Sequence, residues 1–221
     1  MGVLNITPDS FSDGGRFERI DQVLYAAEQM ISDGADILDI GGESTRPGSA
    51  GVSVATELER VAPVIEALAT RFDCPLSIDT SNAETINEAC SQGVALINDV
   101  RALKRPGALA AAVNSASLIC LMHMRGEPDT MDTLTDYDDV TSEVGAYLSN
   151  RADEVIAAGA SAEQLLIDPG FGFAKTTTQN LIMLKQLHRL TELGYPLLVG
   201  MSRKRMIGEV TGQPVARRTP G

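Results

Sequence analysis

Leu76-Ser77-Ile78-Asp79 is a short apolar run that ends in a polar residue, and runs of this kind recur along the chain. An irregular turn follows each run, and a longer segment with the apolar spacing of a helix comes next. Short apolar runs that alternate with helices predict parallel strands buried on both faces of a sheet. The other runs of this kind are Val3-Leu4-Asn5, Ile37-Leu38-Asp39-Ile40, Ala95-Leu96-Ile97-Asn98, Leu118-Ile119-Cys120-Leu121-Met122, Leu165-Leu166-Ile167-Asp168 and Pro196-Leu197-Leu198-Val199-Gly200.

The segments between the runs have the pattern of amphipathic helices. Residues 57–71 and 179–193 both place leucine, isoleucine or valine at three- and four-residue spacings, which predicts an apolar stripe on each helix. Two of the helices are expected to stop just before Gly34 and Gly194, because glycine favours the end of a helix. We see no linker or charge block, so we expect one domain over residues 1–221.

Seven such units predict an α/β fold, a (β/α)₈ TIM barrel that ends before its eighth strand and helix. A doubly wound open sheet fits the periodicity equally well. The barrel places functional groups at the carboxyl ends of several strands. Polar residues do lie at or just past these ends, which favours the barrel; they are Asn5, Asp79, Asn98, His123 and Asp168.

The composition excludes several classes of protein. A net charge of −12 argues against a nucleic-acid surface, which would carry a basic patch. No apolar run approaches the roughly 18 residues that span a bilayer, so we expect a cytoplasmic chain without a membrane segment. The 3 cysteines lie far apart and predict reduced, mostly buried thiols, and 2 histidines are too few for a histidine-rich zinc site.

The polar residues at the strand ends suit a flat heterocycle. Carboxylates and carboxamides predominate among them. An ionised carboxylate accepts two parallel hydrogen bonds from an amino-pyrimidinone edge, and a carboxamide can donate and accept beside it. Each residue alone could instead cap a helix or hold a loop, so the prediction depends on their convergence.

Two long loops rich in Gly, Pro, Ser and Asp follow the first two runs and have the character of lids. The loop at residues 7–15 carries two acidic side chains, Asp13 among them, that could hold a metal or face developing positive charge. The loop at residues 41–48 offers the hydroxyl of Thr45 and the guanidinium of Arg46 to an anionic oxygen.

Residues 200–205 follow the last run and hold three consecutive basic residues beside Ser202. At the start of a helix, this arrangement predicts an anion site. A solvated run of charge is the alternative interpretation.

These motifs resemble those of the dihydropteroate synthases, in the same order and over essentially the whole chain. The first two matches are long enough to make chance agreement implausible, and the others are short. The segments that carry the resemblance are Gly2-Val3-Leu4-Asn5-Ile6-Thr7-Pro8-Asp9-Ser10-Phe11-Ser12-Asp13-Gly14-Gly15, Asp39-Ile40-Gly41-Gly42-Glu43-Ser44-Thr45-Arg46-Pro47-Gly48, Ser77-Ile78-Asp79-Thr80, Ile97-Asn98-Asp99-Val100, Met122-His123-Met124-Arg125-Gly126, Asp168-Pro169-Gly170-Phe171-Gly172-Phe173 and Ser202-Arg203-Lys204.

The resemblance implies a reaction. The family condenses 6-hydroxymethyl-7,8-dihydropterin diphosphate with p-aminobenzoate, assisted by Mg²⁺, to give dihydropteroate and pyrophosphate. It also implies a homodimer and inhibition by sulfonamides, which mimic p-aminobenzoate.

The resemblance further implies a role for each matching residue. The pterin-binding residues would be Asp79, Asn98, Asp168, Met122, Phe173 and Lys204. Asn5 would ligate the metal, and Asp13 would approach the reacting methylene. Thr45, Arg46 and Ser202 would serve the diphosphate and p-aminobenzoate, so that Asp13, Arg46 and Lys204 are the expected catalytic groups.

The sequence departs from the family pattern at two places. Ala174 stands where family members commonly have glycine, a mild change. The family's Arg-x-His motif of an eighth strand is absent, so a barrel that binds pterin without turnover stays open as an alternative. Two enzyme alternatives are a corrinoid methyltransferase domain and an aldolase that forms a Schiff base on Lys204.

Overall fold

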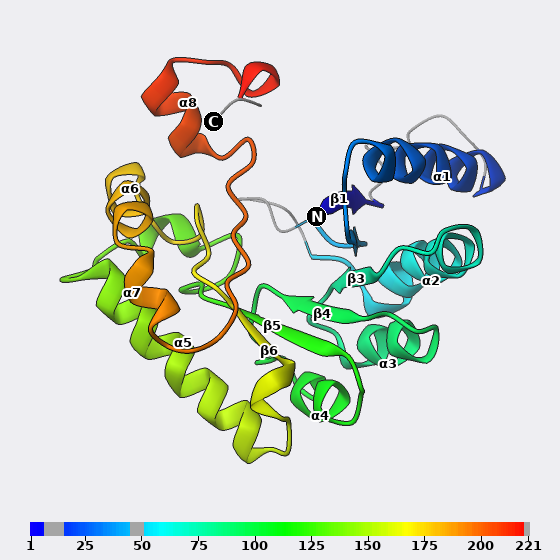
Figure 1. The fold of residues 1–221 in the computed structure, drawn as a ribbon, viewed down its shortest axis with the longest axis horizontal. Helices are drawn as coiled ribbons and strands as arrows, with labels where there is room; N and C mark the ends of the chain where they lie inside the picture. Colours follow the sequence, from blue (N-terminus) through cyan, green and yellow to red (C-terminus); the bar gives the residue numbers. More distant parts are fainter. Residues whose placement is uncertain (7–15, 45–50, 219–221) are drawn as a thin grey trace. The chain divides into compact units, whose positions relative to one another are not determined.

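The computed structural model describes residues 1–6, 16–44 and 51–218 (Figure 1). Within them, short strands alternate with helices along the chain. The strands are β1 (Gly2–Asn5), β2 (Leu38–Gly41), β3 (Leu76–Asp79), β4 (Leu96–Asp99), β5 (Leu118–Met122) and β6 (Leu165–Asp168). The α-helices are α1 (Arg16–Ser32), α2 (Val54–Arg71), α3 (Ala83–Ser91), α4 (Ala108–Val113), α5 (Val140–Ala157), α6 (Thr177–Lys185), α7 (His188–Thr191) and α8 (Arg205–Thr211).

The described strands follow one another in the sheet in the order β1-β2-β3-β4-β5-β6. A doubly wound sheet reverses its strand order at a switch point, whereas a (β/α) barrel adds each strand beside the previous one. The sequential order therefore confirms the α/β barrel class and excludes the open-sheet alternative.

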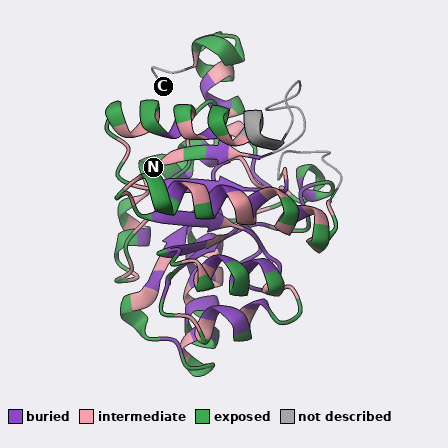
Figure 2. Ribbon diagram, turned by 90° about the vertical axis from the view of Figure 1, so that its right-hand side faces the viewer, coloured by how far each residue is buried: buried purple, intermediate pink, exposed green. Residues whose placement is uncertain are grey.

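The chain divides into two compact units, and the first contains β1 to β4 together with α1 to α4. Its strands are parallel and in register, so that Leu4, Ile40, Ile78 and Ile97 form one row across the sheet. All four are buried, as the purple strands of Figure 2 illustrate. Because side chains alternate along a strand, the residues on either side of this row point to the opposite face.

Helix α2 confirms the apolar stripe predicted for residues 57–71, and it begins three residues earlier than expected. Ser53 is its N-cap and accepts a hydrogen bond from the Thr56 backbone N–H at 3.2 Å. Val61, Ile65 and Leu68 are buried on one side of the helix, as the three- and four-residue spacing requires.

The second unit contains most of β5, all of β6 and helices α5 to α8. The backbone N–H of His123 donates to the carbonyl of Asp168 at 2.9 Å, which ties the end of β5 to the end of β6. The core of this unit includes Leu148, Ile167 and Phe171, each at most 1% exposed.

Two predictions about this unit need correction. The seventh apolar run makes an isolated parallel bridge between Ile167 and Leu197 instead of a strand. Its two backbone hydrogen bonds both go to Ile167, which is too few for a ladder. The helix predicted over residues 179–193 is split into α6 and α7, with a break at residues 186–187.

The inward face of α6 also differs from the predicted leucine stripe, because Asn180 and Met183 are buried while Leu181 and Leu184 are partly exposed. A capping box between Thr176 and Gln179 fixes where the helix begins. The Asn180 carboxamide then bonds the carbonyl of Thr176 and the N–H of Gly172, and these bonds hold that face inward.

The glycine and cysteine expectations have a mixed outcome. The helices before Gly34 and Gly194 do end where predicted, and both glycines have positive φ. Cys120 is buried, whereas Cys74 and Cys90 are partly exposed, so the thiols are less buried than expected; none of the three forms a disulfide.

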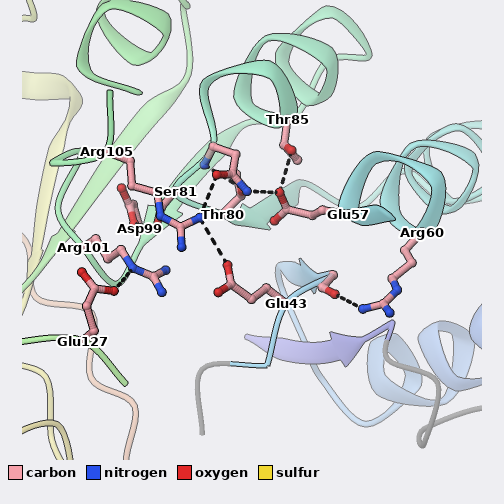
Figure 3. A network of polar contacts seen from close by, with 12 residues as sticks. Glu43, Glu57, Arg60, Thr80, Ser81, Thr85, Asp99, Arg101, Arg105 and Glu127 are labelled. Atoms are coloured by element: carbon pink, nitrogen blue, oxygen red, sulfur yellow. Dashed lines mark hydrogen bonds and ion pairs between the residues drawn. The ribbon is translucent and has the colours of Figure 1, made fainter. Parts of the chain in front are cut away.

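A buried polar network in the first unit holds the chain that follows β2 (Figure 3). The Glu57 carboxylate accepts hydrogen bonds from the Asn82 carboxamide at 2.6 Å and from the Thr85 hydroxyl at 2.7 Å. Arg105 donates to the side-chain Oδ1 of Asn82 at 2.7 Å and lies 3.6 Å from the Glu43 carboxylate. Asn82 thereby links α2 to Arg105, which in turn contacts the segment after β2.

We expect Asn82→Ala to lower the free energy of unfolding by about 2–4 kcal/mol, because it leaves the buried Glu57 carboxylate and the partly exposed Arg105 guanidinium without this partner. Asn87→Ala is the matched control, since Asn87 is exposed on α3, the helix that begins directly after Asn82. Its free energy of unfolding should change by no more than about 0.5 kcal/mol. Urea denaturation measures both variants. Equal stability of the two would contradict the role of the network.

Ala174 adopts a φ of 51°, a left-handed conformation that favours glycine, and is 1% exposed. Ala174→Gly relieves about 1–2 kcal/mol of backbone strain. It also removes a buried methyl worth about 0.8 kcal/mol and adds about 0.5–1 kcal/mol of chain entropy to be lost on folding. We therefore expect a change below about 1 kcal/mol in urea denaturation.

Ala174→Val is the informative companion variant. A β-branched side chain is strongly disfavoured at positive φ, and here it would also crowd a buried site. We expect a loss of about 2 kcal/mol or more in the same denaturation experiment. A valine variant as stable as the glycine variant would refute this description of the turn.

Candidate active site

The carboxyl ends of β1 to β4 form a row of residues in the first unit. Asn5, Gly41, Asp79 and Asn98 are successive partners across the sheet. Gly41 has no side chain, and the place where its Cβ would stand lies 3.7 Å from the Asn5 Oδ1 and 3.6 Å from the Asp79 Oδ2. The glycine therefore leaves an opening that two oxygen atoms flank.

Asp39 lies two residues before the end of β2 and faces the same side as this row. The Ser77 hydroxyl donates to its Oδ1 at 2.6 Å, and the Asn98 carboxamide donates to its Oδ2 at 3.2 Å. Burial raises the pKa of Asp39, and these two donors offset part of the rise. Asp39 thus orients the Asn98 side chain, and its negative charge disfavours ionisation of the Asp79 carboxyl group.

The pKa of Asp79 is raised well above its usual range. The largest cause is burial, and the charges of Asp39, Asp99, Glu57 and Glu43 raise it further. A carboxyl group in such surroundings retains its proton until a ligand supplies hydrogen-bond donors or positive charge. Asp79 is therefore prepared for a ligand whose edge carries N–H groups.

Asp168 occupies the corresponding position at the end of β6 in the second unit. Burial raises its pKa to about 6, while the Gly170 N–H, which donates to Oδ1 at 2.7 Å, and the charges of Lys204 and Lys175 act in the opposite direction. Unlike Asp79, this carboxyl group therefore has cations of its own unit nearby.

Lys204 and Phe173 lie together beside this group. The Lys204 ammonium is 4.3 Å from the centroid of the Phe173 ring, a cation–π contact. Gly172 permits the approach, because a Cβ there would lie 3.1 Å from the Lys204 Cδ. Met122 belongs to the same apolar cluster, against which Phe173 packs. The cluster therefore places an aromatic ring and one positive charge beside each other.

The loop after β6 is shaped by Gly170. Its φ is 68°, and a Cβ there would lie 2.0 Å from the His123 carbonyl oxygen, so that no other residue fits. His123 itself is 2% exposed and makes an edge contact with the Tyr147 ring at 4.9 Å. The histidine therefore supports the loop from behind and belongs to the core.

The structure brings together the predicted residues in two groups. One group is Asn5, Asp79 and Asn98 in the first unit, and the other is Met122, Asp168, Phe173 and Lys204 in the second. Ser202 is exposed on the turn before α8, and no described contact joins it to the second group. Asp13, Thr45 and Arg46 lie outside the described residues.

Sequence reasoning missed Lys175, Asp39 and Glu57 as candidates. Asp39 could have been found from strand alternation, which places it on the same face as residues at the strand end. Glu57 and Lys175 carry no such signal, because a charged residue near the start of a helix is ordinarily exposed. Both are buried here, at 0% and 4% exposure.

Within residues 1–6, 16–44 and 51–218, no group of three or more His, Cys, Asp or Glu side chains could hold a metal ion. No helix there is both long enough and apolar enough to cross a membrane.

Comparisons with known proteins agree on one family. The family model described as "Pterin binding enzyme" matches residues 1–221. The dihydropteroate synthase of Haemophilus influenzae is 48% identical over 221 residues, which are 100% of this chain and 80% of that protein.

Solved structures give the same result. A crystal structure of the Yersinia pestis dihydropteroate synthase with a sulfonamide drug has a TM-score of 0.93 and 49% identity, covering 100% of this chain and 80% of the other. The Xanthomonas albilineans dihydropteroate synthase in complex with 7,8-dihydropteroate has a TM-score of 0.88 and 44% identity, over 99% of this chain and 78% of the other. The chain therefore belongs to the pterin-binding enzymes, and among them to the dihydropteroate synthase family.

Proposed function

We propose that the chain condenses 6-hydroxymethyl-7,8-dihydropterin diphosphate with p-aminobenzoate to give 7,8-dihydropteroate and pyrophosphate. The observation that carries the proposal is the partly exposed Asp79 carboxyl group at the end of β3, which is surrounded by other acidic side chains and suited to the N–H groups of a pterin edge. The family supports the chemistry, because a relative binds 7,8-dihydropteroate and another binds a sulfonamide drug.

The family resemblance implies that residues of each group bind the pterin. Asp79 and Asp168 accept hydrogen bonds from the amino-pyrimidinone edge, and the Asn98 carboxamide bonds beside them. Phe173 and Met122 pack against the ring, and Lys204 provides a donor and a positive charge next to Asp168. These roles rest on the family resemblance and on the local chemistry of each group.

Mg²⁺ fits the first group as a partner of the diphosphate. The Asn5 carboxamide oxygen lies beside the opening at Gly41, and hard oxygen donors are what Mg²⁺ prefers. Mg²⁺ ordinarily takes one or two protein ligands and completes its shell with phosphate oxygens and water. When bound, it would neutralise charge on the leaving pyrophosphate.

The remaining steps concern the protein's own side chains. Arg46, Thr45 and Ser202 would bind the diphosphate and the p-aminobenzoate carboxylate. Departure of pyrophosphate leaves positive charge in the dihydropterin, which the Asp13 carboxylate would stabilise electrostatically. The aniline nitrogen then attacks the methylene, so positioning is the main requirement and no covalent protein nucleophile is needed.

Two further expectations belong to this proposal. A homodimer is suggested by the family, and the partly exposed Leu181, Ile182 and Leu184 of α6 give apolar area that a second copy could cover. A cytoplasmic location agrees with three cysteines that form no disulfide. Light scattering after size exclusion would report the mass of the assembly.

The test of the proposed function is release of pyrophosphate from the pterin diphosphate, measured with Mg²⁺ and with or without p-aminobenzoate. We expect p-aminobenzoate-dependent turnover that falls by about 100-fold or more in Asp79→Asn, because an amide cannot accept two parallel hydrogen bonds from the pterin edge. Asp73→Asn is the matched control, since Asp73 is exposed, and it should retain full activity.

Turnover that survives in Asp79→Asn would contradict the assigned role of this carboxylate. Binding of pterin without any p-aminobenzoate-dependent turnover in the unchanged chain would contradict the proposed reaction itself.

Gly41→Ala tests whether the opening between Asn5 and Asp79 is used. The new methyl would make ordinary contacts at 3.6–3.7 Å, so we expect a folded protein with little change in thermal stability. It would nevertheless fill the space that the ligand and its metal need, and kcat/KM for the pterin diphosphate should fall by about 10-fold or more. Unchanged kinetics would mean that no reacting group enters this opening.

A further inference from the structure

Lys175 follows the loop after β6 and turns its side chain back into the second unit. It is 4% exposed, and its ammonium has three partners, which equals the number of its N–H donors. They are the carbonyl oxygens of Gly170 and Phe173, at 3.0 and 2.9 Å, and the Nδ1 of His123, at 3.0 Å. A buried ammonium with three partners is unusual for a residue at the edge of a helix.

These contacts act on the residues that the proposed function uses. Gly170 and Phe173 bracket the loop that begins at Asp168, so Lys175 closes this loop on itself. The bond to the His123 Nδ1 joins the loop to the end of β5, and it requires the neutral histidine tautomer with its proton on Nε2. The ammonium therefore holds the backbone at Gly170 and at Phe173, in the loop that follows Asp168.

Charge gives Lys175 a second effect. The charged groups around it in the second unit are Asp168, Lys204 and Arg125, and His123 contacts it directly. Burial lowers the pKa of Lys175 to about 7, and the Asp168 carboxylate opposes this shift. In return, the ammonium lowers the pKa of Asp168 and favours the ionised carboxylate.

We propose that Lys175 is a positioning residue for the pterin: its buried ammonium holds the loop that follows Asp168 and carries Phe173, through the carbonyl oxygens of Gly170 and Phe173 and through His123. This inference rests on the proposed function, because it assigns Lys175 to the pterin half of that site. The ammonium touches protein groups only, and it acts on the substrate through Asp168 and Phe173.

The experiment compares Lys175→Met and Lys175→Gln with the unchanged chain. Both variants remove the positive charge. Glutamine retains N–H donors for part of the carbonyl contacts, so Lys175→Gln is expected to fold even if Lys175→Met does not. Dissociation constants for 6-hydroxymethylpterin are measured from pH 5 to 8, together with KM for the pterin diphosphate and for p-aminobenzoate.

We expect the dissociation constant of the pterin to rise by about 10-fold or more at neutral pH, while KM for p-aminobenzoate stays within about twofold. Loss of the cation raises the pKa of Asp168. The acid limb, which is the low-pH side of the curve of pterin affinity against pH, should therefore move to higher pH by about one unit. Binding requires the ionised carboxylate, and it is therefore lost at a higher pH in the variants than in the unchanged chain.

Asn180→Ala is the matched control, because its carboxamide bonds the Gly172 N–H and the Lys175 carbonyl of the same loop and carries no charge. It should weaken pterin binding without moving the acid limb. The inference would be overturned if both Lys175 variants kept the pterin affinity and the pH at which pterin binding is lost. It would also be overturned if affinity for the pterin and for p-aminobenzoate fell equally. Absence of pterin binding by the unchanged chain would instead refute the proposed function, and the inference with it.

Discussion

The crowding of acidic side chains around the partly buried Asp79 carboxyl group at the end of β3 is the constraint around which the site is arranged. A buried carboxylate is unfavourable unless donors or positive charge accompany it, and its charged neighbours in the first unit raise its pKa further. The strand register imposes this crowding, because the end of each strand meets the end of the next. A ligand edge rich in N–H groups relieves this crowding, so ligand binding and ionisation of Asp79 are coupled.

The second unit solves a related problem in a different way. Asp168 is buried, which raises its pKa, but the Gly170 N–H that bonds it and the charges of Lys204 and Lys175 offset part of the rise. The glycines of this loop allow the backbone and Lys204 to approach closely, which a side chain at either position would hinder or prevent. Asp79 thus depends on its ligand for ionisation, whereas the ionised form of Asp168 is favoured by protein cations.

The sequence predicts much of this arrangement, because strand length, burial and the polar residue at the end of each run are local features. The positions of Asp79, Asn98 and Asp168 at strand ends follow from that pattern. The inward turn of Asn180 and the burial of Lys175 depend on hydrogen bonds to a loop whose path is set by Gly170 and Gly172, and no periodicity reports such bonds. The seventh run failed as a strand because an apolar composition does not supply a hydrogen-bonding neighbour.

The central claim is that carboxyl groups at the strand ends ionise when the pterin binds, and proton release measures this most directly. Titration calorimetry with 6-hydroxymethylpterin near pH 6, in buffers of different ionisation enthalpy, gives the number of protons exchanged on binding. Because Asp79 and Asp168 both have raised pKa values in the free protein, the account predicts a net release of protons. Proton uptake on binding, or heats that do not depend on the buffer, would contradict it.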